Sequence, residues 1–538
     1  MKKMRRISEK KKKWIERTAK NDRSYKLFLY NRLFLFLLAV ALQLCVYALF
    51  VLLFAYDATV GVAVQVTAEI LALVFVFWVI NRNDRPSTKM NWVIIVLIAP
   101  VFGVPFYLSY GRGKPTKKMN EKIQRAKSEN DEAFFSFYGA LPELKTQERE
   151  GGTLRYTAVC GGYPAFRDGG VEYFKSGEEA FPVMLDELKR AEKFILLDYF
   201  IIAPGKMWES VLNILLEKAS RGVQVRIIYD DFGCIVTLPP KYDRYLESLH
   251  ENIKCLSFNK VVPLFALRMN NRDHRKILVI DGKVAFTGGA NLADEYIAEK
   301  VRFGYWKDSL VKVTGSSVSS FTRMFFYLWN AFKKEKERLQ DFLIEYEDGG
   351  QVRGERGSFI VQPYDDSPLD SVSVGETVYA DIIDRAKKYV WIFTPYLVLD
   401  DFMRASLCRA SLRGVDIRIV TPGVPDKKAV YRMTRANYET LMKAGVKIYE
   451  YTPGFLHAKS MVSDDECAVV GTINLDYRSL YLHFENAVYF SGCEAVQALK
   501  RDCEETFAVS KLCSKEYPKR TVLGRFVDSV LRVFETLF

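Results

Sequence analysis

The chain has 538 residues, which exceeds the usual size of one domain and favours two core-forming units with additional segments. Hydrophobic residues make up 49% of it, so material for buried cores is plentiful. The net charge of +13 suggests an anionic partner, and a phosphate-bearing lipid, a nucleic acid or a plain solvated surface all satisfy it. The nine cysteines include no C-x-x-C pair, and Cys45 lies in an apolar run. The sequence therefore suggests neither a disulfide framework nor a zinc ribbon. A reducing, cytoplasm-facing soluble part fits best.

The N-terminal part has the pattern of a membrane anchor. Residues 1–32 form a basic leader, followed by a nearly unbroken apolar run at 33–56 and a second run at 58–80, which is interrupted by Gln65 and Glu69. Each run exceeds the roughly 20 residues that a helix needs to cross a bilayer. The length of the leader and the lack of a small-residue cleavage site argue against a signal peptide. We therefore expect two transmembrane helices.

The distribution of charge predicts the orientation of this membrane region, residues 33–118. Basic residues are frequent in the leader and return at Arg82, Arg85 and Lys89, whereas only Asp57 separates the two apolar runs. By the positive-inside rule, both ends of the helix pair lie in the cytoplasm.

A third apolar segment, 92–110, decides on which side of the membrane the rest of the chain lies. It is short, contains Pro100 and Pro105, and is followed by several basic residues that resist translocation. We expect it to be re-entrant or interfacial, which leaves the soluble part in the cytoplasm as the domain of a multi-pass cell-membrane protein.

From about residue 150 the sequence repeats itself. In each copy a strand-like run is followed by an amphipathic stretch and a second strand-like run, which opens after an Arg-Gly-Val sequence. The repeated runs are 194–200 with 220–228, and 390–396 with 412–420, and the copies agree at Arg221 and Arg413, Gly222 and Gly414, Val223 and Val415, and Arg226 and Arg418.

The alternation of strands and helices predicts an α/β fold in two similar halves, residues 150–345 and 355–515, each a sheet covered by helices. The last segment, 516–538, has the spacing of an amphipathic helix. We expect it to pack on a core, with contact to the membrane surface as the alternative.

Each half contains the pattern H-x-K-x4-D, and an asparagine follows each histidine by 17 residues. Only four histidines occur in the chain and two of them head this pattern, so chance does not explain it. The candidate catalytic residues are His274, Lys276 and Asp281 in the first half and His457, Lys459 and Asp464 in the second, with Asn291 and Asn474 as candidate phosphate-binding residues.

Both motifs read as β-hairpins, because strand-like runs flank an Asp-Gly or Asp-Asp turn. A histidine, a lysine and an asparagine then converge at one end of each hairpin. Together they provide a nucleophile or proton carrier, a fixed cation and an amide donor, which suits a phosphate, and two such ends facing one another would form one site. With turns at 281–282 and 464–465, His274 is expected opposite Gly289 and His457 opposite Thr472.

The same geometry separates the motif aspartates from the histidines. At about 3.3 Å per residue, Asp281 lies at the turn, too far from His274 for contact. We therefore interpret Asp281 and Asp464 as structural turn residues. Glu485 and Asp308 are better candidates for orienting the imidazoles, and ordinary surface carboxylates are the alternative for both.

The other two histidines, His250 and His483, have no lysine two places on and are expected to be structural. A metal is not expected, because each motif places one histidine beside a lysine cation that would oppose a divalent ion. We expect no cofactor.

At these residues the chain resembles the phospholipase D superfamily, whose paired H-x-K-x4-D motifs lie in a pseudo-twofold sandwich. Within it, the resemblance is to the bacterial cardiolipin synthases, and paired N-terminal membrane helices also belong to that layout. The long basic leader departs from it. The segments that carry the resemblance are GFLHAK at 454–459, VGTINLDYRS at 470–479, the Phe-Glu pair at 484–485, TPY at 394–396 and GVKIY at 445–449.

The resemblance implies transfer of a phosphatidyl group between two phosphatidylglycerol molecules. His274 would attack phosphorus to give a phosphatidyl-histidine, while His457 would protonate the departing glycerol and then activate the second lipid. Both lysines and both asparagines would hold the phosphoryl oxygens. A hydrolytic phospholipase D is the nearest alternative. The membrane helices weigh against a nuclease and a nucleic-acid partner, and the intact histidines and lysines weigh against an inactive scaffold.

Overall fold

The computed structural model describes residues 54–111, 115–138, 151–260, 270–345, 359–369, 372–514 and 521–533, with a few further positions at 44–52 and 535. They form two compact units. The membrane-region unit comprises the N-terminal part up to Pro115 and the C-terminal helix, and the α/β unit comprises 116–260 and 271–519.

The membrane-region unit contains one helix long and apolar enough to cross a bilayer among the described residues, α3 (Ala58–Ile80). Asp57 caps its first turn by accepting a hydrogen bond of 2.8 Å from the Thr59 backbone N–H. This confirms a helix at the second apolar run. The first run, 33–56, lies largely outside the described residues.

The segment 92–110 belongs to two short helices, α4 (Pro86–Ile98) and α5 (Pro100–Tyr110), which are interrupted at Ala99. They pack closely, because a Cβ atom added at Gly103 would come within 2.7 Å of the Val96 backbone. At 1.5 Å per residue each helix is about 20 Å long or less, shorter than the roughly 30 Å of a bilayer core. This geometry agrees with a re-entrant segment, and its position in the bilayer stays a prediction.

The C-terminal segment forms the amphipathic helix α17 (Val522–Val533). Val533 packs against the cluster of Val79, Trp92, Ile95 and Tyr107, whereas Val522, Leu523 and Phe526 stay exposed. On the apolar face of this helix the expected core packing is therefore found at Val533 and not at the first turns.

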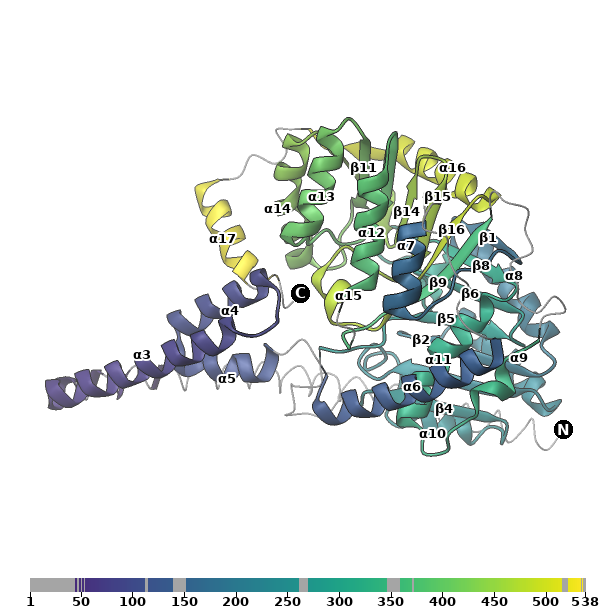
Figure 1. Cartoon of the computed structure of the whole chain (residues 1–538), viewed down its shortest axis with the longest axis horizontal. Coiled ribbons are helices and arrows are strands. Elements are labelled where there is room, and N and C mark those ends of the chain that lie inside the picture. The colour runs from purple at the N-terminus through teal and green to yellow at the C-terminus, as the bar shows by residue number, and fades with distance from the viewer. Residues whose placement is uncertain are drawn as a thin grey trace. The chain divides into compact units, whose positions relative to one another are not determined.

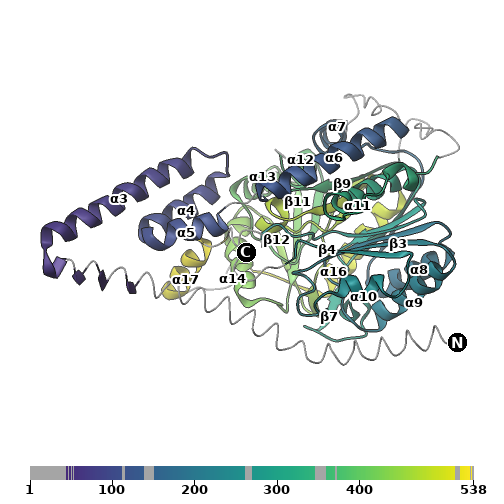
Figure 2. The same cartoon turned by 90° about the horizontal axis from the view of Figure 1, so that it is seen from below.

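The α/β unit consists of two halves with matching sheets (Figures 1 and 2). The first sheet has the order β1 (Gly170–Phe174), β8 (Leu310–Thr314), β6 (Val284–Gly288), β5 (Lys276–Ile280), β2 (Phe194–Tyr199), β3 (Gln224–Asp230), β4 (Ile253–Phe258). The second has the order β9 (Ile360–Asp366), β16 (Glu485–Ser491), β15 (Cys467–Gly471), β14 (Ser460–Ser463), β10 (Tyr389–Phe393), β11 (Asp416–Pro422), β12 (Lys447–Tyr451), β17 (Ser510–Leu512). The additional strand β17 extends the edge of the second sheet.

The internal repeat is confirmed. The repeated unit is β2, α9 (Lys206–Ser220) and β3 in the first half and β10, α13 (Asp401–Leu412) and β11 in the second, with parallel strands in both. Gly222 and Gly414 follow the two helices with φ values of 97° and 95°, a conformation that favours glycine. The duplicated Arg-Gly-Val therefore marks the end of a helix.

Helices cover both sheets, and the hydrophobic core continues through both halves. The central helix of the first half, α11 (Val318–Phe332), is buried along almost its whole length. The other helices of the two halves are α6 (Lys117–Tyr138), α7 (Gly151–Tyr156), α8 (Gly177–Arg190), α9 (Lys206–Ser220), α10 (Tyr242–Glu247), α12 (Val374–Arg385), α13 (Asp401–Leu412), α14 (Lys428–Lys443), α15 (Tyr477–Tyr481) and α16 (Glu494–Ala508).

Both motif hairpins exist, β5–β6 and β14–β15, but the predicted register is wrong by one residue. The last strand pairs are Ile280↔Val284 and Ser463↔Cys467, so each turn has three residues instead of two. Two positive φ values in each turn, 53° and 69° at Asp281 and Gly282 and 55° and 65° at Asp464 and Asp465, accommodate the extra residue. The pairings of His274 with Gly289 and of His457 with Thr472 are corrected accordingly. The regular strands begin at Lys276 and Ser460, after the histidines.

The motif aspartates lie in the hairpin turns, as the hairpin geometry predicts. The Asp281 carboxylate accepts hydrogen bonds of 2.7 to 2.8 Å from three successive backbone N–H groups, residues 192–194. Asp464 does the same for residues 387–389 at 2.8 to 2.9 Å. Each carboxylate thus ties its turn to the start of the neighbouring strand, β2 or β10.

We predict that Asp464→Asn lowers the stability of the protein by about 2 kcal/mol or more, because three charge-assisted hydrogen bonds are weakened. Asp465→Asn is the matched control, since this neighbour pairs with Lys500 at the surface. Thermal unfolding in detergent measures both. Loss of activity in Asp464→Asn at unchanged stability would contradict the structural role.

Candidate active site

Each motif histidine lies at a backbone pairing between the two halves, in which an extended segment of one half runs beside an extended segment of the other. Strand β13 (Gly454–Leu456) pairs in parallel with β7 (Tyr305–Lys307), and the His457 N–H donates to the Lys307 carbonyl at 2.7 Å. In the equivalent pairing, Asp273 bridges to Phe484, and the His274 N–H donates to the Phe484 carbonyl at 2.8 Å. The backbone therefore fixes each histidine on the opposite half.

A carboxylate of the opposite half holds each imidazole. Both carboxylate oxygens of Glu485 lie 2.9 Å from His274 Nδ1, and Asp308 Oδ2 lies 2.7 Å from His457 Nδ1. Both carboxylates are fully buried, so neither is an ordinary surface group. With Nδ1 engaged, Nε2 is the ring atom left for a substrate on each histidine. The two residues predicted to orient the imidazoles are in the place that this role needs.

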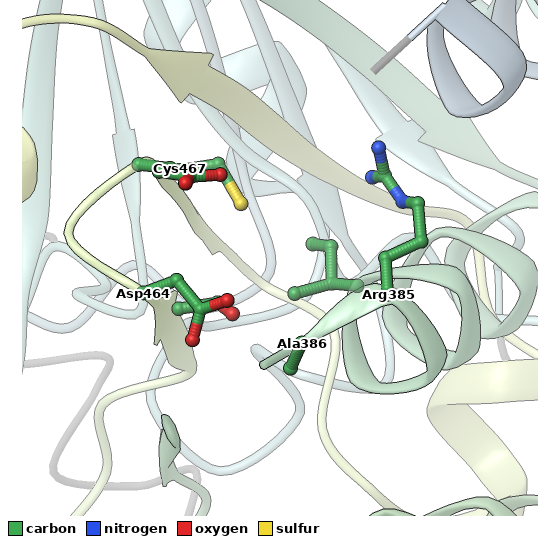
Figure 3. Close-up of a pocket in the computed structure, with 7 residues that line it drawn as sticks. Arg385, Ala386, Asp464 and Cys467 are labelled. Atoms are coloured by element: carbon green, nitrogen blue, oxygen red, sulfur yellow. The ribbon is translucent and has the colours of Figure 1, made fainter. Parts of the chain in front are cut away.

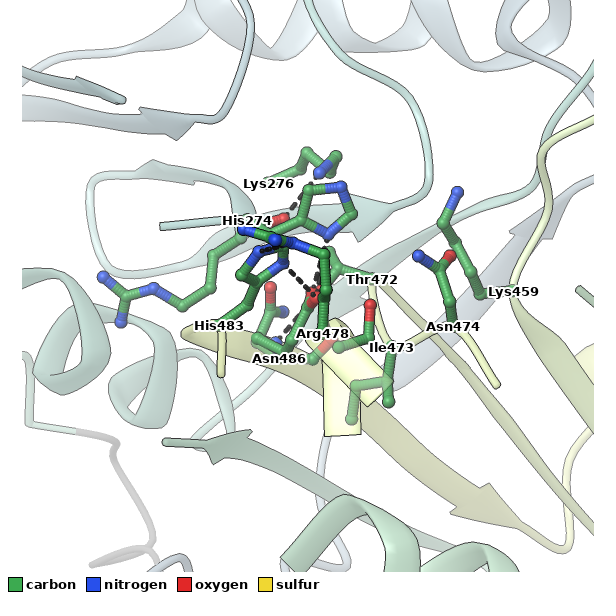
Figure 4. A network of polar contacts seen from close by, with 12 residues as sticks. His274, Lys276, Lys459, Thr472, Ile473, Asn474, Arg478, His483 and Asn486 are labelled. Atoms are coloured by element: carbon green, nitrogen blue, oxygen red, sulfur yellow. Dashed lines mark hydrogen bonds and ion pairs between the residues drawn. The ribbon is translucent and has the colours of Figure 1, made fainter. Parts of the chain in front are cut away.

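The motif lysines lie next to their histidines and are buried as well. Lys276 Nζ donates to the His274 carbonyl at 2.5 Å, and Lys459 Nζ donates to the His457 carbonyl and lies 2.9 Å from its Nδ1. Figure 4 shows His274 and Lys276 of the first half gathered with Lys459 and Asn474 of the second. The charges of Lys276, Lys459 and His457 all act on the pKa of His274, so the two lysines and two imidazoles are near enough to one another to form one candidate site.

The two asparagines hold the surrounding loops. Asn291 accepts from the Ile201 N–H at 3.0 Å and donates to the Tyr296 hydroxyl at 2.8 Å. Asn474 donates to Asp476 at 2.9 Å. Each amide still has a second N–H, so the predicted contact with a phosphoryl oxygen stays a prediction.

Aromatic rings enclose the two imidazoles differently. The rings of Tyr296, Trp306 and Phe455 lie 5.4 to 5.8 Å from that of His457. The neighbours of His274 are Phe200 at 4.9 Å and His483 at 5.6 Å. These walls exclude water, so charges in the site are poorly solvated.

Burial and the neighbouring lysines lower the pKa of His274 well below its usual value and the pKa of His457 to about 4. Burial also lowers the pKa of Lys276 to about 8 and that of Lys459 to about 7. The pKa of Asp308 is lowered despite its burial, because His457 and Lys459 stabilise the carboxylate. The site thus repels further positive charge and suits an anion.

The prediction from the sequence did not place His483 near the site, because only histidines with a lysine two residues later were taken as candidates. His250 does have a local role, since its Nδ1 accepts from the Asn252 N–H at 3.2 Å. His483, in contrast, brings one nitrogen within 4.8 Å of the nearest donor atoms of His274 and Glu485, a trio that could also hold a metal ion. His274 and Glu485 of this trio already form a histidine–carboxylate pair through two contacts of 2.9 Å. That pair explains why the three side chains lie close together.

A separate pocket lies beside the turn of the β14–β15 hairpin (Figure 3). Its lining includes Arg385, Ala386, Asp464 and Cys467. The Asp464 carboxylate is already used by three backbone N–H groups, so it offers no catalytic group here. We assign no site to this pocket.

Comparison with known proteins agrees with this geometry. The family described as "Cardiolipin synthase, PLD-like domain" matches residues 184–325 and 379–507, which include both motifs. A cardiolipin synthase of Geobacillus sp. (strain WCH70) is 30% identical over 89% of this chain and 94% of its own length. The chain belongs to the cardiolipin synthase family. Another relative, an uncharacterized protein of Streptococcus mutans serotype c, is 41% identical over 86% of this chain and 99% of its own.

Two further similarities concern the N-terminal region and the fold. Residues 70–112 match the family "Phospholipase_D-nuclease N-terminal", which supports the membrane region as part of the family layout. The crystal structure of phosphatidylserine synthase from Haemophilus influenzae Rd KW20 covers 72% of this chain and 98% of its own, with a TM-score of 0.53 and 15% identity. The latter likeness shows the phospholipase D fold alone.

We predict that Glu485→Gln and Asp308→Asn each lower kcat by about 100-fold or more, because the imidazole loses the charge that fixes its tautomer and orientation. Asp502→Asn is the control, since this buried carboxylate also joins the halves, through Lys307 at 2.7 Å, but touches neither imidazole. Initial rates at matched folded fractions measure the effect. A kcat of Glu485→Gln equal to that of Asp502→Asn would refute the role.

Proposed function

We propose that the protein is a cardiolipin synthase, which transfers a phosphatidyl group from one phosphatidylglycerol to another and releases glycerol. The observation that carries the proposal is the pair of imidazoles held by carboxylates of opposite halves, His274 by Glu485 and His457 by Asp308. One phosphorus between two such rings receives a nucleophile on one side and a proton donor on the other.

In the first step, His274 Nε2 attacks phosphorus, the new P–N bond forms and the bond to the glycerol oxygen breaks. Glu485 stabilises the positive charge that develops on the imidazole. His457 transfers its proton to the departing oxygen. In the empty site the pKa of His457 is about 4, because burial and Lys459 disfavour its charged form. A bound phosphodiester anion offsets the lysines and raises this pKa, so the substrate itself favours the acid form.

In the second step, His457 accepts the proton of a hydroxyl group on the second phosphatidylglycerol. The hydroxyl oxygen attacks phosphorus, the P–N bond breaks and cardiolipin leaves. The same pair of histidines thus serves both half-reactions in reverse roles, and Lys276 and Lys459 balance the charge of the phosphoryl oxygens. Asn291 and Asn474 add amide donors to the same oxygens.

The membrane region supports a lipid alcohol as the acceptor, because an apolar helix in the same chain tethers the protein to a bilayer, where lipids are concentrated. We propose a multi-pass arrangement with the α/β unit in the cytoplasm, which follows from the basic residues at both ends of the helix pair. A hydrolytic phospholipase D would share the first step, and water would resolve the intermediate.

The deciding experiment supplies labelled phosphatidylglycerol to the purified protein in detergent. We expect cardiolipin and free glycerol, whereas phosphatidic acid as the sole product would contradict the proposal. His274→Ala and His457→Ala should each lower the rate by at least about 1000-fold, because they remove the nucleophile or the acid. With a phosphatidyl ester of p-nitrophenol, which needs no acid, His457→Ala should still form a labelled protein adduct. His274→Ala should not, and the reverse result would exchange the two roles.

We predict that the fall of kcat/KM with rising pH, which begins at the pKa of about 4 of the acid His457 in the free enzyme, becomes steeper through about 7 to 8, because Lys459 and Lys276 lose their protons there at pKa values of about 7 and 8. The decline of kcat should occur at higher pH, since the bound anion raises both pKa values. Lys459→Arg keeps its charge and should move the decline of kcat/KM upward. Profiles of kcat and kcat/KM that decline at the same pH would contradict this.

A further inference from the structure

Trp306 and His483 occupy equivalent positions in the two halves. Trp306 lies two residues before Asp308, and His483 lies two residues before Glu485. The two segments are equivalent because the middle residue of each accepts a backbone hydrogen bond from a motif histidine of the other half. The Lys307 carbonyl accepts from the His457 N–H, and the Phe484 carbonyl accepts from the His274 N–H. Two extended segments thus bring a ring and a carboxylate to each imidazole.

The geometry directs both rings into the site. Residues two apart on an extended segment project from the same face. The side chain of Trp306 therefore points to the same side as that of Asp308, and His483 to the same side as Glu485, which is the side of the imidazoles. The ring of Trp306 lies 5.4 Å from that of His457, and the ring of His483 lies 5.6 Å from that of His274.

Both rings carry a buried nitrogen without a hydrogen-bond partner among the described residues, Nε1 of Trp306 and Nδ1 of His483. Arg478 Nε donates to His483 Nε2 at 3.2 Å, which makes Nε2 the acceptor and places the proton on Nδ1 (Figure 4). That N–H faces a Glu485 oxygen at 3.6 Å, a long contact that opposes the effect of burial on the pKa of His483 and leaves the N–H poorly satisfied. A buried donor without a partner is costly, and Trp329 and Trp391 also bury such an indole N–H. What distinguishes Trp306 and His483 is that both lie beside a motif imidazole, where a ligand can accept the hydrogen bond.

We infer that Trp306 Nε1–H and His483 Nδ1–H are hydrogen-bond donors to the oxygens of the bound phosphodiester, one beside each imidazole. The inference rests on the proposed function, since an in-line displacement between the histidines places one ester oxygen near each ring. Neither donor is a cation. The indole does not titrate, and burial lowers the pKa of His483 to about 3, so both keep their proton arrangement at neutral pH. They position the phosphodiester independently of pH, whereas the lysines do not.

Three variants test the inference. Trp306→Phe keeps an aromatic ring and removes the N–H, His483→Leu removes the donor, and His483→Asn restores one. Trp391→Phe is the matched control, because its indole N–H is also buried without a partner but lies in β10, beside Tyr389 and Phe507. The rate of consumption of labelled phosphatidylglycerol into all products, and its competitive inhibition by inorganic phosphate, are measured for each variant.

Trp306→Phe and His483→Leu should each lower kcat/KM by about tenfold to 100-fold, the effect of one hydrogen bond to a charged ligand, and raise the inhibition constant of phosphate. His483→Asn should recover most of the loss, and Trp391→Phe should match the unaltered protein. The pH dependence of kcat/KM should keep its shape in all variants.

Two results would overturn the inference. The first is a Trp306→Phe variant as active and as sensitive to phosphate as Trp391→Phe, and the second is a folded His483→Asn variant as impaired as His483→Leu. Both results are read from the total consumption of phosphatidylglycerol, so neither depends on whether cardiolipin or phosphatidic acid forms. The products of the unaltered protein test the proposed function separately, because total consumption responds to the donors for either acceptor, lipid or water.

Discussion

The active site depends on an exchange of carboxylates between two halves of one chain. Glu485 of the second half holds the imidazole of the first, and Asp308 of the first half holds that of the second. Backbone hydrogen bonds at both histidines repeat the exchange. Neither half therefore contains a complete catalytic unit, and the continuous hydrophobic core that joins the sheets is also what assembles the site.

The remaining architecture fixes the ends of the two motif hairpins. Asp281 and Asp464 tie the turns to the start of the neighbouring strands, so the hairpins are anchored far from the phosphate chemistry. The aspartate of the motif is thus coupled to the histidine through a strand and not through a contact. In both copies the aspartate lies at the turn, and the histidine and lysine of the candidate site lie at the opposite end of the hairpin.

Much of this could be predicted from the sequence, because duplication doubles every signal. The paired motifs and the Arg-Gly-Val repeats follow from spacing and strand alternation. Glu485 and Asp308 were only candidates, chosen because hairpin geometry places the motif aspartates too far from the histidines. The hairpin register did not, since the positive φ of Asp281 and Asp464 adds a turn residue that the Asp-Gly pattern does not reveal. His483 was missed because its proximity to His274 arises from pairing between halves, which no local pattern records.

Lys459 is buried beside His457, and burial lowers its pKa to about 7, so under the proposed function its charge depends on the acidity at the membrane surface. A leaflet rich in acidic lipids carries a negative surface potential that concentrates protons within about one Debye length. A site that must be protonated to receive its substrate is then favoured where such lipids are abundant. Under the proposed function, local depletion of charged headgroups would weaken substrate capture by the same route.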